Sequence, residues 1–376
     1  MSFRLSAGKG IRRILLPAFL LAAGLCAWAG SAEAQEVTVL DISGRVVTLE
    51  RPARRILIDD GRYLTALALI HPDPVSLLAG WPRDVNRLGK RTYQAYLAKF
   101  PRIGSVPQVA SSAGEFSLEL ALAARPDVAI VSLGQGPTAE QVRQLERAGV
   151  KVVFIDFFTQ PFENLEISLQ VLGAVVGRSG EAKAYIDFRR SHMDRIAERL
   201  RSLNEARPTV FLEAHAGISA DCCNSPGRGN IGDYIDFVGG HNVGADVIPG
   251  ATGRLNLEYV VSRDPTVYVA TGGPHLEQAG GLVLGPGYSA QQSRAALSRM
   301  AARRGISQLS AVRDGRTHGL SHQLLNSPLD ILAVETLAKW VHPGLFADLD
   351  PARTLREINE RYLVVPLEGT YWVDLR

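Results

Sequence analysis

The sequence predicts an α/β protein of two lobes with mainly parallel sheets, joined by one long helix. Residues 128–131 and 152–155 are short apolar runs that flank a helical pattern at 138–148, which is the order of a βαβ unit. Runs of this kind suit a parallel sheet that is covered on both faces. The longest helical pattern, at 179–203, would span about 40 Å at the usual rise per residue. We expect it to separate the two lobes.

The two halves around this helix repeat one local feature. Leu118-Glu119 is followed, nine residues after the glutamate, by the apolar run that starts at Val128. Leu257-Glu258 is followed at the same distance by the run that starts at Val267. In both places a short helix is predicted to lead into a buried strand. The repeat supports two similar α/β lobes.

Other elements are predicted in chain order. Alternating apolar residues around a turn at 41–44 predict a hairpin over 37–49. Short apolar runs predict strands at 56–58 and 210–212. Ser327, Pro328 and Asp330 match an N-cap, a first-turn proline and a first-turn acid, so a late helix is predicted to begin at Ser327. The apolar stripe of the long helix is interrupted by Arg189-Arg190.

The first 34 residues are typical of an export signal. A basic stretch that ends at Arg12-Arg13 precedes an apolar run, and Ser31-Ala32-Glu33-Ala34 provides a cleavage site after Ala34. Removing this segment leaves 37 basic and 37 acidic residues of the original 41 and 38. A mature net charge near zero argues against a nucleic-acid partner. The Arg pair leaves both general secretory and twin-arginine export open.

Four segments follow from these patterns. The signal covers 1–34, the N-terminal lobe 35–178, the bridging helix 179–203 and the C-terminal lobe 204–376. Cleavage leaves two cysteines, the adjacent Cys222 and Cys223, within a polar, Gly-rich loop at 221–230. Neighbouring Cα atoms lie about 3.8 Å apart, below the usual disulfide range. Two free thiols and a vicinal disulfide therefore both remain open.

Several of these motifs together resemble one known family. The motifs are the hairpin with Arg54-Arg55-Ile56, the segments 118–130 and 148–152, Gly239-Gly240-His241-Asn242-Val243 and the segment 257–269. Together they resemble the periplasmic solute-binding proteins of ABC importers for ferric siderophores, haem and vitamin B12. The resemblance covers essentially the whole mature chain. It implies a ligand cleft between the lobes, a periplasmic location, an ABC permease dimer as partner and no enzyme activity. We expect a monomer, small lobe movements and a largely preformed cleft.

The resemblance also assigns two glutamates. In this family one glutamate on each lobe docks into arginine pockets of the permease, and Glu119 and Glu258 stand at the matching positions. Carboxylates on one face of the two lobes could report their arrangement to a dimeric transporter by charge pairing. Each could equally be a solvated first-turn acid that the helix dipole favours.

Candidate ligand groups lie in loops after the predicted strands, because ligands of open α/β sheets bind beyond the carboxyl ends of strands. Arginine and aromatic side chains suit an anionic, ring-rich iron chelate. The predicted ligand is therefore an iron complex, a ferric siderophore or a haem-like chelate, with no covalent cofactor. The candidate residues are Arg62, Tyr63, Trp81, Arg83, Tyr93, His215, Arg228, His275, His318 and His322.

Two alternatives remain. His318 and His322 have H-x-x-x-H spacing, but residues 318–321 are typical of a strand that runs into a loop, so we predict no metal site. A zinc or manganese receptor would need these scattered histidines to converge. An exported NAD-dependent oxidoreductase would use Gly134, Gly136 and Ala139 as a G-x-G-x-x-A loop, with Asp156 on the ribose. Pro137 disfavours this reading, since it removes an N–H where the phosphate would sit.

Overall fold

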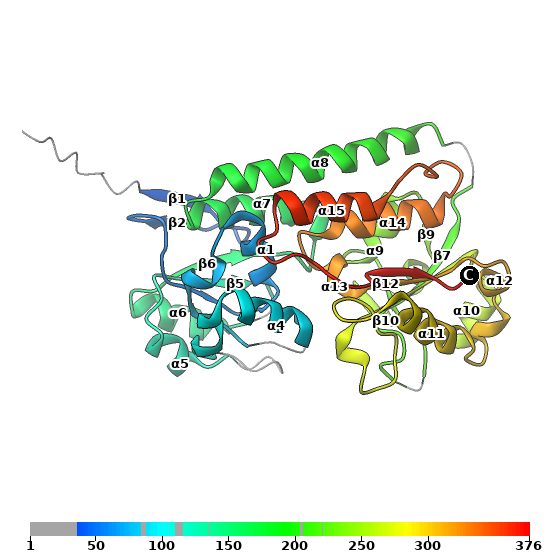
Figure 1. Cartoon of the computed structure of the whole chain (residues 1–376), viewed down its shortest axis with the longest axis horizontal. Helices are drawn as coiled ribbons and strands as arrows, with labels where there is room; N and C mark the ends of the chain where they lie inside the picture. Colours follow the sequence, from blue (N-terminus) through cyan, green and yellow to red (C-terminus); the bar gives the residue numbers. More distant parts are fainter. Residues whose placement is uncertain (1–35, 84–87, 110–115, 135, 204–205, 220) are drawn as a thin grey trace, which may run out of the picture. The chain divides into compact units, whose positions relative to one another are not determined.

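The strands form two main sheets, one in each half of the chain, in the computed structural model (Figure 1). The structure describes residues 36–376 except 84–87, 110–115, 135, 204–205 and 220. The strands are β1 (Val37–Leu40), β2 (Val46–Leu49), β3 (Ile56–Ile58), β4 (Leu78–Gly80), β5 (Val128–Ser132), β6 (Lys151–Ile155), β7 (Thr209–Glu213), β8 (Asn224–Pro226), β9 (His241–Asn242), β10 (Thr252–Arg254), β11 (Val267–Gly272), β12 (Thr317–Ser321) and β13 (Trp372–Asp374).

The topology of the two sheets confirms the predicted α/β class. The first sheet has the order β4-β3-β5-β6 and is parallel throughout. The second has the order β13-β12-β11-β7-β9 and is parallel except for β13. The predicted hairpin is present as the antiparallel pair β1-β2, and β8 pairs with β10 in the same way.

One helix runs past both sheets (Figure 1). This helix, α8 (Ser179–Arg201), contacts α7 and α1 beside the first sheet and α14 beside the second. It corresponds to the predicted bridge, although it ends at Arg201 and not at 203. The other helices are α1 (Tyr63–Ile70), α2 (Pro74–Leu77), α4 (Lys90–Lys99), α5 (Leu118–Ala123), α6 (Ala139–Arg147), α7 (Pro161–Val175), α9 (Gly232–Phe237), α10 (Leu257–Arg263), α11 (Ala290–Ala301), α12 (Ser310–Arg313), α13 (His322–Leu325), α14 (Asp330–Val341) and α15 (Pro351–Arg361).

The βαβ unit of the first lobe is β5-α6-β6. Thr138 caps α6, since its hydroxyl accepts from Gln141 N at 3.2 Å and the Gln141 side chain accepts from Thr138 N at 2.8 Å. This capping box satisfies two backbone donors at the helix start. Every residue of β5 is buried, as the continuous apolar run predicts.

The late helix begins two residues further along than the sequence predicts, with Leu329 at the N-cap position in place of Ser327. Ser327 does not cap it; its hydroxyl accepts from Leu329 N at 3.3 Å, in the turn after α13. The helix α14 begins at Asp330, which is fully buried. The acid at this position therefore serves another purpose than stabilising an exposed first turn.

Asp330 pairs with Arg189 of α8. The Arg189 Nε and Nη2 atoms donate to the two Asp330 carboxylate oxygens at 2.8 and 2.7 Å. Arg189 is only 3% exposed, so the residue that interrupts the apolar stripe lies on the buried face of the helix. Arg190, beside it, is exposed and pairs with Glu166. The buried pair joins the bridging helix to the second lobe.

The predicted signal at 1–34 and its cleavage after Ala34 lie outside the described residues. In the part of the chain that the structure describes, none of the helices combines the length and apolar character needed to cross a membrane.

Candidate ligand-binding site

Three histidines that are far apart in the sequence meet at the carboxyl edge of the second sheet. His215 follows β7, His275 follows β11 and His322 follows β12. These strands are parallel neighbours, so their carboxyl ends share one edge. His215 Nδ1 lies 2.9 Å from His275 Nε2, and the His215 and His322 ring centroids are 3.8 Å apart. We call His215, His275 and His322 the histidine cluster.

His322 has both ring nitrogens in hydrogen bonds. Its Nε2 lies 3.1 Å from the amide nitrogen of Asn326, which donates, so Nε2 accepts. Its Nδ1 then carries the proton and donates to the Thr271 hydroxyl at 3.0 Å. Among the described residues, no group of three or more His, Cys, Asp or Glu side chains is placed to hold a metal ion. His322 supports the His215 ring by packing against it.

The imidazoles of the cluster are held in the neutral form. Burial lowers the pKa of His215 to about 4, and the charges of His275 and Arg62 add to the effect. Burial also lowers the pKa of His275. The pKa of His322 is well below its ordinary value, again because of burial first and neighbouring charges second. A protonated ring is costly here because the buried environment disfavours its charge.

Arg62 of the first lobe faces this cluster. Its effect on the pKa values of His215 and His322 reflects a cation close to both rings. Arg62 pairs with Asp60, with Nη2 to Oδ2 at 2.7 Å, and its guanidinium lies 3.7 Å from the centroid of the Phe158 ring. The carboxylate and the aromatic face hold the guanidinium in place.

Arg62 also borders a cavity at the second lobe. This cavity, lined by Arg62, Leu324 and Tyr371, measures about 30 Å³. The Asn230 side chain also donates a hydrogen bond to the Phe158 carbonyl, which joins the two lobes. The preformed cleft and the small lobe movements stay predictions.

The remaining candidates lie elsewhere. Tyr63 is fully buried and donates to Ser132 Oγ at 2.7 Å. Trp81 is buried and stacks on Tyr93, with ring centroids 6.1 Å apart. Arg83 donates to the carbonyls of Gly104 and Val106. These contacts are internal to the first lobe, so of its candidates Arg62 is the one placed beside the cluster.

Two candidates of the second lobe also lie apart from the cluster. His318 is 7% exposed, and its ring stacks on Trp340. Its Nδ1 lies 2.7 Å from Asp374 Oδ1. Arg228 is exposed in the segment between β8 and α9. The H-x-x-x-H pair is split because His318 lies within β12 while His322 begins α13.

The segment 221–230 is more regular than the loop the sequence predicts, because it contains β8. Cys222 and Cys223, just before β8, are joined by a disulfide. Cys223 is buried in the core of the second lobe. Arg254 of β10 pairs with Asp221 at 2.9 Å and donates to the Cys222 carbonyl at 3.0 Å. The paired cysteines therefore belong to the framework beside β10.

Glu119 and Glu258 occupy equivalent local positions. Each is exposed and lies in the first turn of a short helix, α5 or α10. Ser117 caps the first helix and Asn256 the second. Both helices lead into buried strands, so the predicted repeat is present in the structure; its docking role remains a prediction.

The glycine loop of the oxidoreductase alternative has a structural explanation. Gly136 has φ +84°, and a Cβ there would lie 2.0 Å from the Asp59 carboxylate. Asp156, the proposed ribose ligand, is 1% exposed and accepts from Phe158 N, Thr159 N and the Asn164 side chain. The loop encloses a carboxylate and Asp156 already has its donors, so neither feature favours a dinucleotide.

Gly136→Ala is predicted to destabilise the protein more than Gly134→Ala. Both glycines have positive φ, but a Cβ on Gly134 meets nothing within 4 Å. We expect about 1 kcal/mol for the backbone cost at Gly134 and about 1–3 kcal/mol more at Gly136, where Asp59 must move. Urea denaturation of the two variants measures the difference. Equal losses would contradict the close packing against Asp59.

Sequence reasoning missed three supporting side chains. Phe158 lies under Arg62, Thr271 receives the His322 proton, and Asn326 donates to His322. Position alone offers a signal for two of them, since Phe158 follows β6 closely and Thr271 lies near the end of β11. Asn326 becomes a partner only because a helical turn follows β12.

Comparisons with known proteins agree with this architecture. The TroA-like periplasmic binding protein FepB from Veillonella parvula has a TM-score of 0.81 and 24% identity, over 90% of this chain and 100% of that one. The Haemophilus influenzae protein MolA bound to molybdate has a TM-score of 0.67 and 17% identity, over 88% of this chain and 99% of that one. A periplasmic haem-binding protein from Pseudomonas aeruginosa has a TM-score of 0.57 and 22% identity, over 78% of this chain and 94% of that one. No curated protein matches the sequence.

Two α/β lobes linked by one helix are the fold that this chain shares with these periplasmic binding proteins. Residues 67–323 match the periplasmic binding protein family, and the chain belongs to it. Proteins of this family are not enzymes; they bind small molecules and work with ABC permeases in the periplasm.

Proposed function

We propose that this protein captures an iron complex, a ferric siderophore or a haem-like chelate, and delivers it to an ABC permease dimer. The observation that carries the proposal is the neutral His215–His275 pair opposite Arg62. The printed ligands of two structural relatives, haem and molybdate, both contain a metal, which supports a metal complex as the ligand.

The histidine pair offers two complementary groups. In the 2.9 Å contact between His215 Nδ1 and His275 Nε2, one nitrogen carries the proton and the other accepts it. Each neutral ring has one proton, so one outer nitrogen, His215 Nε2 or His275 Nδ1, has a lone pair and the other carries N–H. A lone pair can complete the coordination of a metal, and the N–H can donate to an oxygen of the chelate.

Arg62 offers guanidinium N–H donors to an anionic chelate, while its charge is shared with Asp60. Its guanidinium is oriented by Asp60 and Phe158 on the opposite lobe. A chelate brings most of its own metal ligands, so one imidazole and one guanidinium suffice to recognise it. A bare zinc or manganese ion needs three or four protein ligands, and His322 has both nitrogens in use.

Replacing His215 or His275 by alanine is predicted to weaken chelate binding by about tenfold or more, as expected for loss of one metal or charge-assisted contact. His241→Ala is the matched control, because His241 lies in the same lobe and pairs with Asp246. Absorption titration with haemin and with ferric tris-catecholate measures binding. Tight binding of bare Zn²⁺ or Mn²⁺ with no chelate bound, or equal affinities in all three variants, would overturn the proposal.

Export and delivery complete the proposal. Residues 1–34 direct the chain to the periplasm, where a monomer without a covalent cofactor binds its ligand. Glu119 and Glu258, one on each lobe, then contact arginines of the permease. Their exposure and their matching first-turn positions support this role.

A further inference from the structure

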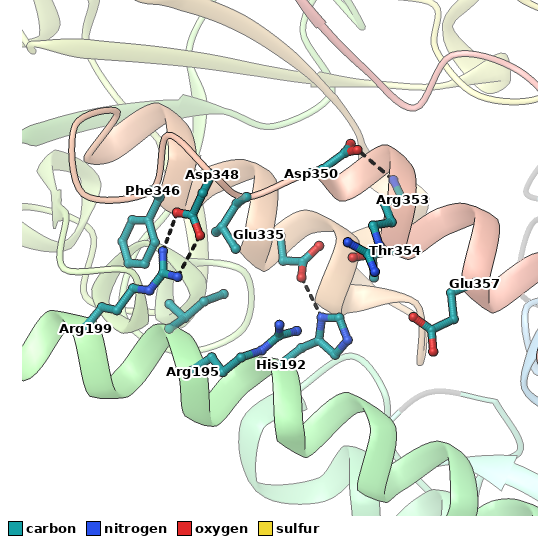
Figure 2. Close-up of a pocket in the computed structure, with 12 residues that line it drawn as sticks. His192, Arg195, Arg199, Glu335, Phe346, Asp348, Asp350, Arg353, Thr354 and Glu357 are labelled. Carbon is teal, nitrogen blue, oxygen red and sulfur yellow. Dashed lines mark hydrogen bonds and ion pairs between the residues drawn. The ribbon is translucent and has the colours of Figure 1, made fainter.

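A second cavity lies away from the histidine cluster, between the bridging helix and the last two long helices. It measures about 280 Å³, and its walls come from α8, α14, α15 and the segment between α14 and α15 (Figure 2). His192 and Arg195 belong to α8, Glu335 to α14, and Arg353 and Thr354 to α15. The family resemblance places the ligand between the lobes, so this cavity has no part in the proposed capture of a chelate.

One buried acceptor in this cavity has no partner. Glu335 is 2% exposed, and its Oε1 lies 2.6 Å from His192 Nδ1. Its Oε2 is buried and has no hydrogen-bond partner within the part of the chain that the structure describes. In Figure 2 the carboxylate extends from α14 into the space between α8 and α15. A buried carboxylate oxygen without a donor costs about 1–3 kcal/mol or more, so this atom would gain from a donor on a bound molecule.

Two of the three arginines in the cavity walls have no ion pair among the described residues, although the walls also carry four carboxylates. Asp348 is held by Arg199 at 2.5 Å and 2.8 Å, and Asp350 accepts from Ala352 N and Arg353 N. Glu357 pairs with Arg361, and Asp350 also lies 3.6 Å from Arg356. Within the described residues, neither Arg195 nor Arg353 makes an ion pair. They stand on helices at opposite sides of the cavity, as Figure 2 shows.

We propose that this cavity binds a small carboxylate that carries a hydrogen-bond donor beside it, as amino acids and hydroxy acids do. Arg195 and Arg353 bind the carboxylate, since guanidinium groups match its geometry. The neighbouring ammonium or hydroxyl donates to Glu335 Oε2. The two unmet requirements, an anion for the guanidiniums and a donor for the buried oxygen, are thus met by one molecule.

Three acids with the same four-carbon skeleton test this assignment. L-Aspartate carries an ammonium, L-malate a hydroxyl and succinate no donor. Isothermal titration of the full mature chain is expected to show binding of aspartate or malate, with succinate weaker by about tenfold, since one hydrogen bond to a charged group contributes about 1.5–3 kcal/mol. The preferred acid tells which donor Glu335 accepts from.

Variants locate the binding. Arg195→Gln and Arg353→Gln are each expected to weaken the preferred acid by about tenfold or more. Arg190→Gln is the matched control, because Arg190 is on the same helix but pairs with Glu166 outside the cavity. Glu335→Gln should remove the advantage over succinate while circular dichroism shows an intact fold. Lack of binding of all three acids at millimolar concentration, or equal losses in the Arg190 variant, would overturn the proposal.

Discussion

Arg189→Met is expected to lower the free energy of unfolding by about 3–5 kcal/mol, because it removes one partner of a buried ion pair. The change leaves Asp330, which is fully buried, without its two charged hydrogen bonds at 2.8 and 2.7 Å. Tyr234 also donates to Asp330, at 3.2 Å, but one neutral donor does not replace a guanidinium. Urea denaturation of the mature chain measures the loss.

The neighbouring arginine is the control for this prediction. Arg190 is exposed and pairs with Glu166, so Arg190→Met should cost less than about 1 kcal/mol. Combining Arg189→Met with Asp330→Leu should recover much of the lost stability, because an apolar pair can replace a buried ion pair. Similar losses for the two arginine variants, or a double variant no better than Arg189→Met, would contradict this account.

Glu119→Ala and Glu258→Ala are each expected to reduce uptake by about tenfold or more while leaving ligand affinity unchanged. Losing one partner of a buried charge pair at an interface costs about 2–5 kcal/mol. Both side chains are exposed and lie in short helices, away from the histidine cluster in sequence and secondary structure. Uptake of an iron-55 complex by cells that carry only the variant measures transport, and titration of the purified protein measures affinity.

Glu163→Ala controls for the loss of a first-turn acid. Glu163 is exposed in the first turn of α7, so its removal takes a favourable charge from a helix N-terminus, as removal of Glu119 or Glu258 does. Uptake should stay near the wild-type level in this variant. A Glu119 or Glu258 variant that loses affinity as strongly as uptake would show that the residue contacts ligand and not the permease.

Local patterns predicted the elements well where one physical cause acts along the chain. The apolar runs at 128–131 and 152–155 became β5 and β6, and the helical pattern at 138–148 became α6, which Thr138 caps. The predicted start of α14 was wrong by two residues, because Ser327 is used by the turn after α13. Cap patterns indicate a helix start only when no neighbouring turn competes for the same side chain.

The sequence suggested candidate residues by type but not by arrangement. Three of the ten candidates, His215, His275 and His322, meet at the carboxyl edge of the second sheet, and the charge of Arg62 acts on the pKa of His215. Tyr63 and Trp81 stand at similar places in the chain but are buried in the first lobe. The pattern of a loop after a strand does not say which way a side chain turns, so it cannot separate these two groups.

The sequence by itself determined the α/β class, the bridging helix and the edge of each sheet at which polar groups collect, since these follow from apolar periodicity and from where strands end. Tertiary structure alone decided that Arg189 would be buried against Asp330 and that three scattered histidines would touch. Both depend on the order of strands and on the packing of helices that are distant in the chain. Contacts of that kind are set by the burial of many side chains at once, and no local spacing records them.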